Sequence, residues 1–267
     1  MLLDSVVHQA QGLHSYTPRR ELRLLPVVAP PEDGPWLELL WQLCAHLQRL
    51  GYPVAVLDGT ALESHHSPGL AQLLGARPWP GAQGLDAGAA HDLSLAVLPA
   101  ARGLAWLADR AQLGDDGVLQ RLQPLLRAYA AVVLYAPAER LAPLLLGSAS
   151  IPLVMTGPGA QGMVRSYRQL KHLALHAGVR CTVAAVVPPQ AAAQPHQTAQ
   201  VLATLQRSAH RHLGLQVHTT TVATHSPREI QRLALQLMEN TVLLDCAMPL
   251  QPAHDAPAHA NARTWSH

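Results

Sequence analysis

Residues 22–58 read LRLLPVVA PPEDGP WLELLWQLCAHLQRL GYPVAVLD. The first eight residues are almost entirely apolar and predict a buried strand over 22–29. After a proline-rich loop, large apolar residues recur every three or four positions across 36–50, the spacing of a helix with one apolar face. A turn at Gly51 then leads into a second apolar run that ends at Asp58. The order strand, loop, helix, turn and strand predicts a βαβ unit with two parallel strands.

The loop of this unit stands where a nucleotide-binding chain carries its glycine-rich phosphate loop. In such a loop, backbone N–H groups surround the phosphates, a lysine reaches the β and γ oxygens, and a hydroxyl holds magnesium. Here three prolines have no N–H to donate, two acids place negative charge at the phosphate position, and a Trp-Leu pair replaces the Lys-Ser/Thr pair. The positions concerned are Pro30, Pro31, Glu32, Asp33, Pro35, Trp36 and Leu37. We therefore expect a protein with the scaffold of an ATPase but without catalytic residues or a cofactor.

The remainder of the chain alternates apolar strands with amphipathic helices. Strands are expected at 93–98, 130–135, 152–156, 179–187 and 216–222, and helices at 69–74, 102–111, 115–129, 163–177, 198–213 and 227–239. Because the strands lack polar alternation, they indicate a mostly parallel central sheet covered by helices on both faces, which is a three-layer α/β/α fold. We expect an N-terminal arm at 1–21, one α/β domain at 22–248 and a disordered tail at 249–267.

Composition narrows the classes of function. The chain has 267 residues, 49% of them hydrophobic, which is enough for one well-packed domain. A formal charge of +2 with 13% charged residues provides no basic stripe that would follow a phosphate backbone, so we expect no nucleic-acid partner. No apolar run nears the roughly 20 residues of a membrane span, and the N-terminus lacks a signal-peptide pattern. The three cysteines lie in apolar sequence without C-x-x-C spacing, which favours buried free thiols, so a protein of the reducing cytoplasm is expected.

The order of elements and the loop resemble the MinD/ParA type of P-loop ATPase over most of residues 8–245. The family reads K-G-G-V-G-K-T at the loop. Counting back from Gly51 puts Pro31 on the signature lysine, Trp36 on the Walker lysine and Leu37 on the first threonine. The resemblance implies the P-loop ATPase fold with its nucleotide-binding motif degenerate.

The strand ends that carry the family's acids differ as well. The second strand usually ends Asp-x-Asp, whereas this chain retains Asp58 and has Thr60 at the position that helps to activate the attacking water. The Walker B strand usually ends Asp-x-Pro, and here Tyr135 replaces the magnesium-linked acid while Pro137 is retained. The resemblance therefore implies a pseudo-ATPase.

Within that family, the N-terminal segment resembles the FlhG branch, which regulates flagellar number and placement. Residues 8–14 read HQAQGLH, similar to the D-Q-A-x-x-L-R motif with which FlhG engages the GTPase FlhF. Gln9, Ala10 and Leu13 are retained, whereas histidines replace the two charged positions. The resemblance implies a regulator or scaffold that binds an FlhF-like GTPase or a flagellar switch or basal-body protein through these three residues. Whether the chain forms a homodimer stays open.

Other interpretations stay open as well. One alternative is a carboxylate cluster for acid–base catalysis or metal binding, formed by Glu32, Asp33 and Asp58. Acids are also common at helix starts, however, where they cap free N–H groups. The enzyme alternatives are a nucleotide hydrolase with a relocated site and a cellulose-synthesis-associated MinD-like protein. The 16 histidines show no recognised ligand spacing with Cys or acids, so we expect no designed metal site. The helix at 227–239 is expected to pack on the sheet rather than dock on a membrane.

Overall fold

The computed structural model describes residues 21–30, 34–75, 95–157, 159–188 and 195–244. In chain order its elements are β1 (Arg23–Val28), α2 (Trp36–Arg49), β2 (Val54–Asp58), α3 (Leu70–Leu74), β3 (Ala96–Pro99), α4 (Ala101–Gln112), the 3-10 helix η2 (Val118–Arg121), α5 (Leu122–Leu125), β4 (Ala131–Ala136), α6 (Ala138–Leu145), β5 (Leu153–Thr156), α7 (Ala160–Ala177), β6 (Thr182–Val187), α8 (Pro195–Leu213), β7 (His218–Ala223), α9 (Pro227–Glu239) and β8 (Val242–Leu243). Strands and helices alternate along most of the chain.

The described strands form one sheet in the order β3-β2-β4-β1-β5-β6-β7, and β8 pairs with β1. Only the β1–β8 pair is antiparallel among these strands. At the centre of the sheet, β1 and β4 run in register from Arg23 opposite Ala131 to Val28 opposite Ala136. Every side chain of β4 is buried, because helices cover both faces, and this is why its sequence is a continuous apolar run. The expected mostly parallel α/β sheet is confirmed.

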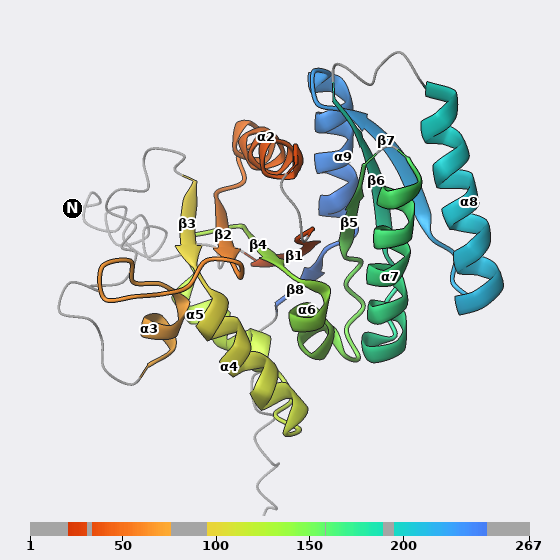
Figure 1. Cartoon of the computed structure of the whole chain (residues 1–267). Helices are drawn as coiled ribbons and strands as arrows, with labels where there is room; N and C mark the ends of the chain where they lie inside the picture. The colour runs from red at the N-terminus through yellow and green to blue at the C-terminus, as the bar shows by residue number, and fades with distance from the viewer. Residues whose placement is uncertain (1–20, 31–33, 76–94, 158, 189–194, 245–267) are drawn as a thin grey trace, which may run out of the picture.

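Two layers of helices cover the sheet. On one face, α2 and α9 pack against each other over a core that includes Leu39, Leu233 and Tyr135. On the other face, α4, α6, α7 and α8 pack in succession over a second core that includes Leu104 and Leu141. Figure 1 shows α2 and α9 on one side of the strands and α4, α6 and α7 on the other. The three-layer α/β/α arrangement is therefore confirmed.

Some local expectations differ from the structure. The continuous helix at 115–129 is wrong, since the chain forms η2 and the short α5 there. Gly117 has φ of 84°, outside the helical range, and Pro124 would lie in the interior of a continuous helix, where it lacks an N–H and collides with the preceding turn. Two elements, α6 and β8, were not expected. Pro143 lies inside α6 and weakens its helical signature.

Candidate functional site

At the carboxyl edge of the sheet, the loops that leave neighbouring strands lead to helices on opposite faces. From β1 the chain passes to α2 on one face, whereas from β4 and β5 it passes to α6 and α7 on the opposite face. In open α/β sheets, ligands bind in the crevice between loops that leave neighbouring strands in opposite directions. The candidate site is therefore formed by the loops that follow β1, β2, β4 and β5.

Trp36, the first residue of α2, lies between the loops after β1 and β5. A Cβ atom placed on Gly34 would lie 2.3 Å from Trp36 Nε1, and one placed on Gly157 would lie 3.3 Å from Trp36 Cη2. The indole thus packs against two glycine backbones, and it also contacts the core beneath α2. Its Nε1–H is buried without an acceptor among the described residues. Leaving such a donor unsatisfied costs about 1–3 kcal/mol. A large aromatic ring therefore stands at the position that the family resemblance assigns to the Walker lysine.

The start of α2 provides few groups that would hold a phosphate. Its N-cap residue is Pro35, which makes no side-chain cap. Leu37, at the threonine position of the resemblance, has 48% of its surface exposed, so its side chain faces away from the core. Pro30 is half-buried at the end of the described part of the loop. Proline at two of these positions removes two N–H donors from the edge.

Some of the predicted residues have no described placement. The residues that lie outside the described ranges are Gln9, Ala10, Leu13, Pro31, Glu32 and Asp33. The roles expected for the arm, and the capping role of the two acids, stay predictions. The tail expected at 249–267 also lies outside these ranges.

Asp58 ends β2 at the same edge, and its carboxylate is used within its own turn. Oδ1 accepts hydrogen bonds from the backbone N–H of Thr60 at 2.9 Å and from Thr60 Oγ1 at 2.6 Å. A short-range turn of this kind is a common role for aspartate after a strand. Within the described ranges, no group of three or more His, Cys, Asp or Glu side chains is arranged to hold a metal ion.

Tyr135 lies beside Asp58, because the two residues are register partners on neighbouring strands. The tyrosine is 5% exposed and belongs to the core under α2. Burial, and then the negative charge of Asp58, raise the pKa of Tyr135 to about 12. The phenol is therefore neutral at physiological pH, so the position to which the resemblance assigns a magnesium-linked acid carries no charge here.

Backbone hydrogen bonds hold the loops of this edge together. The N–H of Ala29 donates to the carbonyl of Ala136 at 2.9 Å, and the N–H of Gly59 donates to the carbonyl of Tyr135 at 2.7 Å. A Cβ atom on Gly59 would lie only 2.6 Å from the Cβ of Ala136. The structure thus brings Trp36 and Asp58 to one edge with Tyr135, and it packs the connecting loops closely.

Glu63 is a buried acid beyond β2 that the sequence pattern does not single out. Its carboxylate accepts hydrogen bonds from the backbone N–H groups of Ala71 at 3.2 Å, Arg102 at 2.7 Å and Gly103 at 2.8 Å. Burial opposes its ionisation, but these N–H donors outweigh burial and hold the pKa of Glu63 below its ordinary value. An acid side chain therefore occupies the N-terminus of α4. No local spacing signals it, because two of its partners are about 40 residues away.

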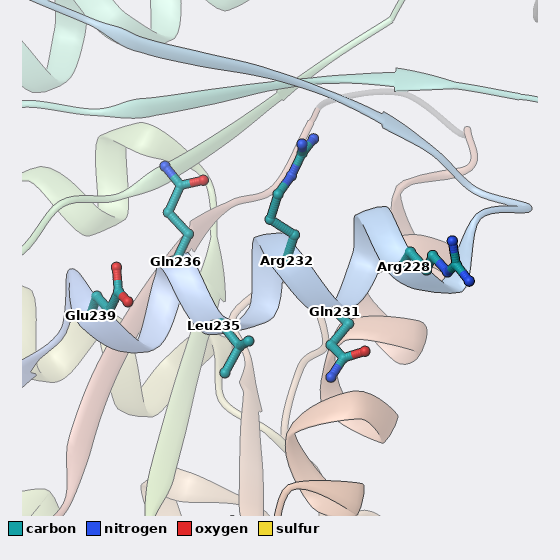
Figure 2. A pocket seen from close by; sticks show the side chains of 6 residues that line it. All are labelled: Arg228, Gln231, Arg232, Leu235, Gln236 and Glu239. Carbon is teal, nitrogen blue, oxygen red and sulfur yellow. The ribbon is translucent and has the colours of Figure 1, made fainter.

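The last helix, α9, packs on the sheet as predicted. Ile230, Leu233 and Leu237 are among its buried residues. Its outer face is mostly polar and borders a shallow cavity of about 400 Å³. Figure 2 shows the residues of this face, which are Arg228, Gln231, Arg232, Leu235, Gln236 and Glu239. No helix of the described chain is both long and apolar enough to cross a bilayer.

Comparison with known proteins gives matches among solved structures only. No family model matches the chain, and no curated protein matches it. The cobyrinic acid a,c-diamide synthase of Mycobacterium smegmatis with bound ADP and magnesium is 16% identical, with a TM-score of 0.49, covering 82% of this chain and 94% of that chain. The MinD cell division protein of Aquifex aeolicus is 12% identical, with a TM-score of 0.48, covering 85% of this chain and 100% of that chain.

A ParA family ATPase of Chlorobium tepidum is also similar. It is 12% identical, with a TM-score of 0.44, covering 83% of this chain and 96% of that chain. The α/β fold of the present chain is established by its own strand order and helix layers.

Proposed function

We propose that the chain is a MinD/ParA-like pseudo-ATPase that acts by binding other proteins. The observation that carries this proposal is the position of Trp36, whose ring lies between Gly34 and Gly157 at the carboxyl edge of the sheet. A ring there occupies space that phosphates would need, and it supplies no positive charge to neutralise them. The neutral Tyr135 supports the same proposal, because it stands at the position to which the resemblance assigns a magnesium-linked acid.

The more specific proposal is that the protein is a regulator or scaffold in flagellar number, placement or assembly. It rests on the resemblance of residues 8–14 to the FlhG motif, with Gln9, Ala10 and Leu13 as the retained contacts. The partner is then an FlhF-like GTPase or a flagellar switch component. A protein that does not bind ATP loses the ligand that would shift it between two states, so its binding surfaces stay in one conformation.

Calorimetric titration of the full chain with ATP and with ADP, each with magnesium, tests the pseudo-ATPase. We expect no binding heat and no thermal shift up to millimolar nucleotide. Binding tighter than about 100 μM, roughly −5.5 kcal/mol, would overturn the proposal and favour a nucleotide hydrolase. A titration with magnesium chloride alone separates nucleotide binding from metal binding.

Capture of a purified FlhF-like GTPase tests the flagellar partner. We expect the full chain to retain the GTPase and a chain lacking residues 1–21 to lose it, because the retained motif lies in that arm. A triple Gln9→Ala, Ala10→Ser and Leu13→Ala variant is the matched control for loss of the motif without truncation. Capture that is unchanged by both alterations contradicts the arm as the binding element.

A further inference from the structure

Much of one end of the sheet is built from a stretch of sequence without acidic residues. Between Glu139 and Glu229 the chain has no Asp or Glu, although it contains 17 of them in total, and it has eight of the 19 Lys and Arg residues. Residues 140–228 therefore carry a formal charge of +8, whereas the rest of the chain carries −6. This stretch forms β5, α7, β6, α8 and β7, which lie together at one end of the sheet (Figure 1).

At this end of the sheet, a cavity of about 550 Å³ gathers basic side chains from three segments. Arg180 precedes β6, Arg207 and His210 belong to α8, and His218 begins β7, and all four are exposed. We call these four residues the basic pocket. No acid lines the cavity, and both ion pairs found among the described residues involve Asp115 on another part of the fold.

Helix electrostatics explain only part of the basic pocket. Cations near the carboxyl end of a helix are stabilised by the helix dipole, which accounts for His210 near the end of α8. Arg207 also hydrogen bonds along its own helix, to the carbonyl of Ala203 and to Thr204 Oγ1, both at 3.3 Å. Arg180 and His218 come from other elements, so the dipole of α8 does not require them. Their convergence gives a site that attracts anions.

The basic pocket lies at the start of β7, which is an edge strand of the described sheet. In a strand, the N–H and C=O of one residue point to the same edge, and this direction alternates from residue to residue. Thr224 donates toward β6 at 3.2 Å, whereas Ala223 donates to the Glu229 carboxylate at 2.7 Å. Thr219 and Thr221 therefore point their backbone groups away from β6, and no described element pairs with them. An edge of this kind accepts an added strand.

We propose that β7 and the basic pocket together bind an extended acidic segment of a partner protein. The main chain of the segment pairs with the outward N–H and C=O groups of Thr219 and Thr221, and a carboxylate of the same segment enters the basic pocket. Strand pairing supplies affinity through main-chain hydrogen bonds, and the pocket selects acidic sequences. This surface is at the end of the sheet that begins β7, away from the carboxyl edge, so the inference holds whether or not that edge binds nucleotide.

The observations favour a peptide over a nucleic acid. Single strands of nucleic acid bind through aromatic side chains that stack on bases. The acid-free stretch contains one aromatic residue of the Phe, Trp and Tyr type, Tyr167, and it packs against the core. A nucleic-acid backbone also has no groups that continue a β-ladder. An open strand edge next to a cationic cavity therefore fits a polypeptide.

Fluorescence anisotropy with the full chain and a labelled peptide of alternating glutamate and valine tests the proposal, in about 50 mM salt so that charge attraction is little screened. We expect saturable binding that weakens about tenfold in the double variant Arg180→Ser, Arg207→Ser. The matched control is Arg168→Ser, Lys171→Ser, which removes the same charge from exposed positions of α7 and leaves binding within about twofold.

Strand pairing is tested separately. Thr219→Pro removes an outward N–H without touching the β6–β7 ladder, so it weakens binding about tenfold, while Thr219→Ala does not. The peptide with alternate N-methylated residues tests the same point on the unaltered protein, and we expect it to bind about tenfold more weakly. Equal binding of both peptides, or no binding of either, overturns the proposal.

Other occupants are assessed with the same variants. A short DNA duplex and vesicles that contain phosphatidylglycerol are titrated in the same way. A peptide partner is overturned if either binds more tightly than the peptide and its binding weakens about tenfold in the double variant Arg180→Ser, Arg207→Ser. Self-association of the full chain that disappears in Thr219→Pro, measured by sedimentation, overturns a separate partner in favour of a second copy.

Discussion

The backbone N–H of Gly103 donates a hydrogen bond of 2.8 Å to Oε1 of Glu63, 40 residues earlier in the chain. Glu63 is 1% exposed, and its other oxygen accepts from the N–H of Arg102. Since these N–H groups belong to the first turn of α4, they have no partner within the helix. The acid therefore joins the loop after β2 to the start of α4, and it stabilises the carboxyl edge of the sheet.

Glu63→Gln is expected to lower the free energy of unfolding by about 2 kcal/mol. The amide puts an NH₂ donor in place of one carboxylate oxygen, so this donor faces a backbone N–H group that it cannot accept from. Denaturant unfolding measures this value. The control, Glu239→Gln on the exposed face of α9, is expected to change stability by less than about 0.5 kcal/mol. Equal effects of the two variants would show that the Glu63 contacts do not stabilise the fold.

The same carboxylate makes stability depend on pH. Its pKa in the folded chain is below the ordinary value of 4.5, so the folded state holds the proton less tightly than the unfolded state does. The stabilisation is complete above about pH 5 and is lost as the pH falls through 4.5 and below. Unfolding curves between pH 3 and pH 7 are expected to converge for the unaltered chain and Glu63→Gln at the acid end. Curves that stay parallel contradict this linkage.

Gly69→Ala is expected to cost about 3 kcal/mol or more of unfolding free energy. A Cβ atom at this position would lie 1.9 Å from the carbonyl oxygen of Pro99, and backbone cannot move away as a flexible side chain does. Gly75→Ala, at the other end of α3, meets nothing closer than 3.5 Å and has φ of −69°, so its effect stays within about 0.5 kcal/mol. Thermal unfolding of both variants distinguishes a close approach from a general glycine effect.

Trp36→Phe is expected to leave the free energy of unfolding within about 1 kcal/mol of the original value. Phenylalanine keeps a ring between Gly34 and Gly157. It also removes the buried Nε1–H, which has no acceptor among the described residues, and removing this unsatisfied donor offsets the smaller apolar area. Trp36→Ala empties the space and costs about 2 kcal/mol or more. Urea unfolding measures both, and equal losses in the two variants would contradict the packing of the ring between the two glycines.

The two faces of α9 give a further test. Leu233→Ala is expected to cost about 2–4 kcal/mol, because Leu233 is 1% exposed in the core between α9 and the sheet. Leu235→Ala, two residues later and 42% exposed, is expected to cost less than about 1 kcal/mol. Denaturant midpoints of the two variants decide the outcome, and similar losses contradict the packing of α9 on the sheet.

The buried cysteines are expected to be unreactive in the folded protein. Burial raises the pKa of Cys44 and of Cys181 to about 12, so only about 1 in 10,000 of either thiol is ionised at pH 8. Iodoacetamide labelling read by peptide mass spectrometry is expected to modify both residues in denaturant and neither in its absence. Labelling of Cys181 in the native chain at the unfolded rate contradicts its burial.

Local periodicity was sufficient for the elements whose pattern persists over many residues. Leu39 and Leu233 lie on helix faces that the sequence spacing identified, and both are buried as expected. The pattern failed where backbone chemistry or brevity interrupted it. Pro143 concealed α6, and Gly117 divided the expected helix at 115–129.

The sequence by itself determined most of the order of strands and helices along the chain and the presence of tryptophan rather than lysine at position 36, because both depend on residue type and spacing along the chain. Tertiary structure alone decided that Trp36 packs against Gly157, that Glu63 caps α4, and that the outward edge of β7 adjoins a basic pocket. Each of these relationships joins segments distant in sequence. Their contacts depend on the strand order of the sheet, which local periodicity does not encode.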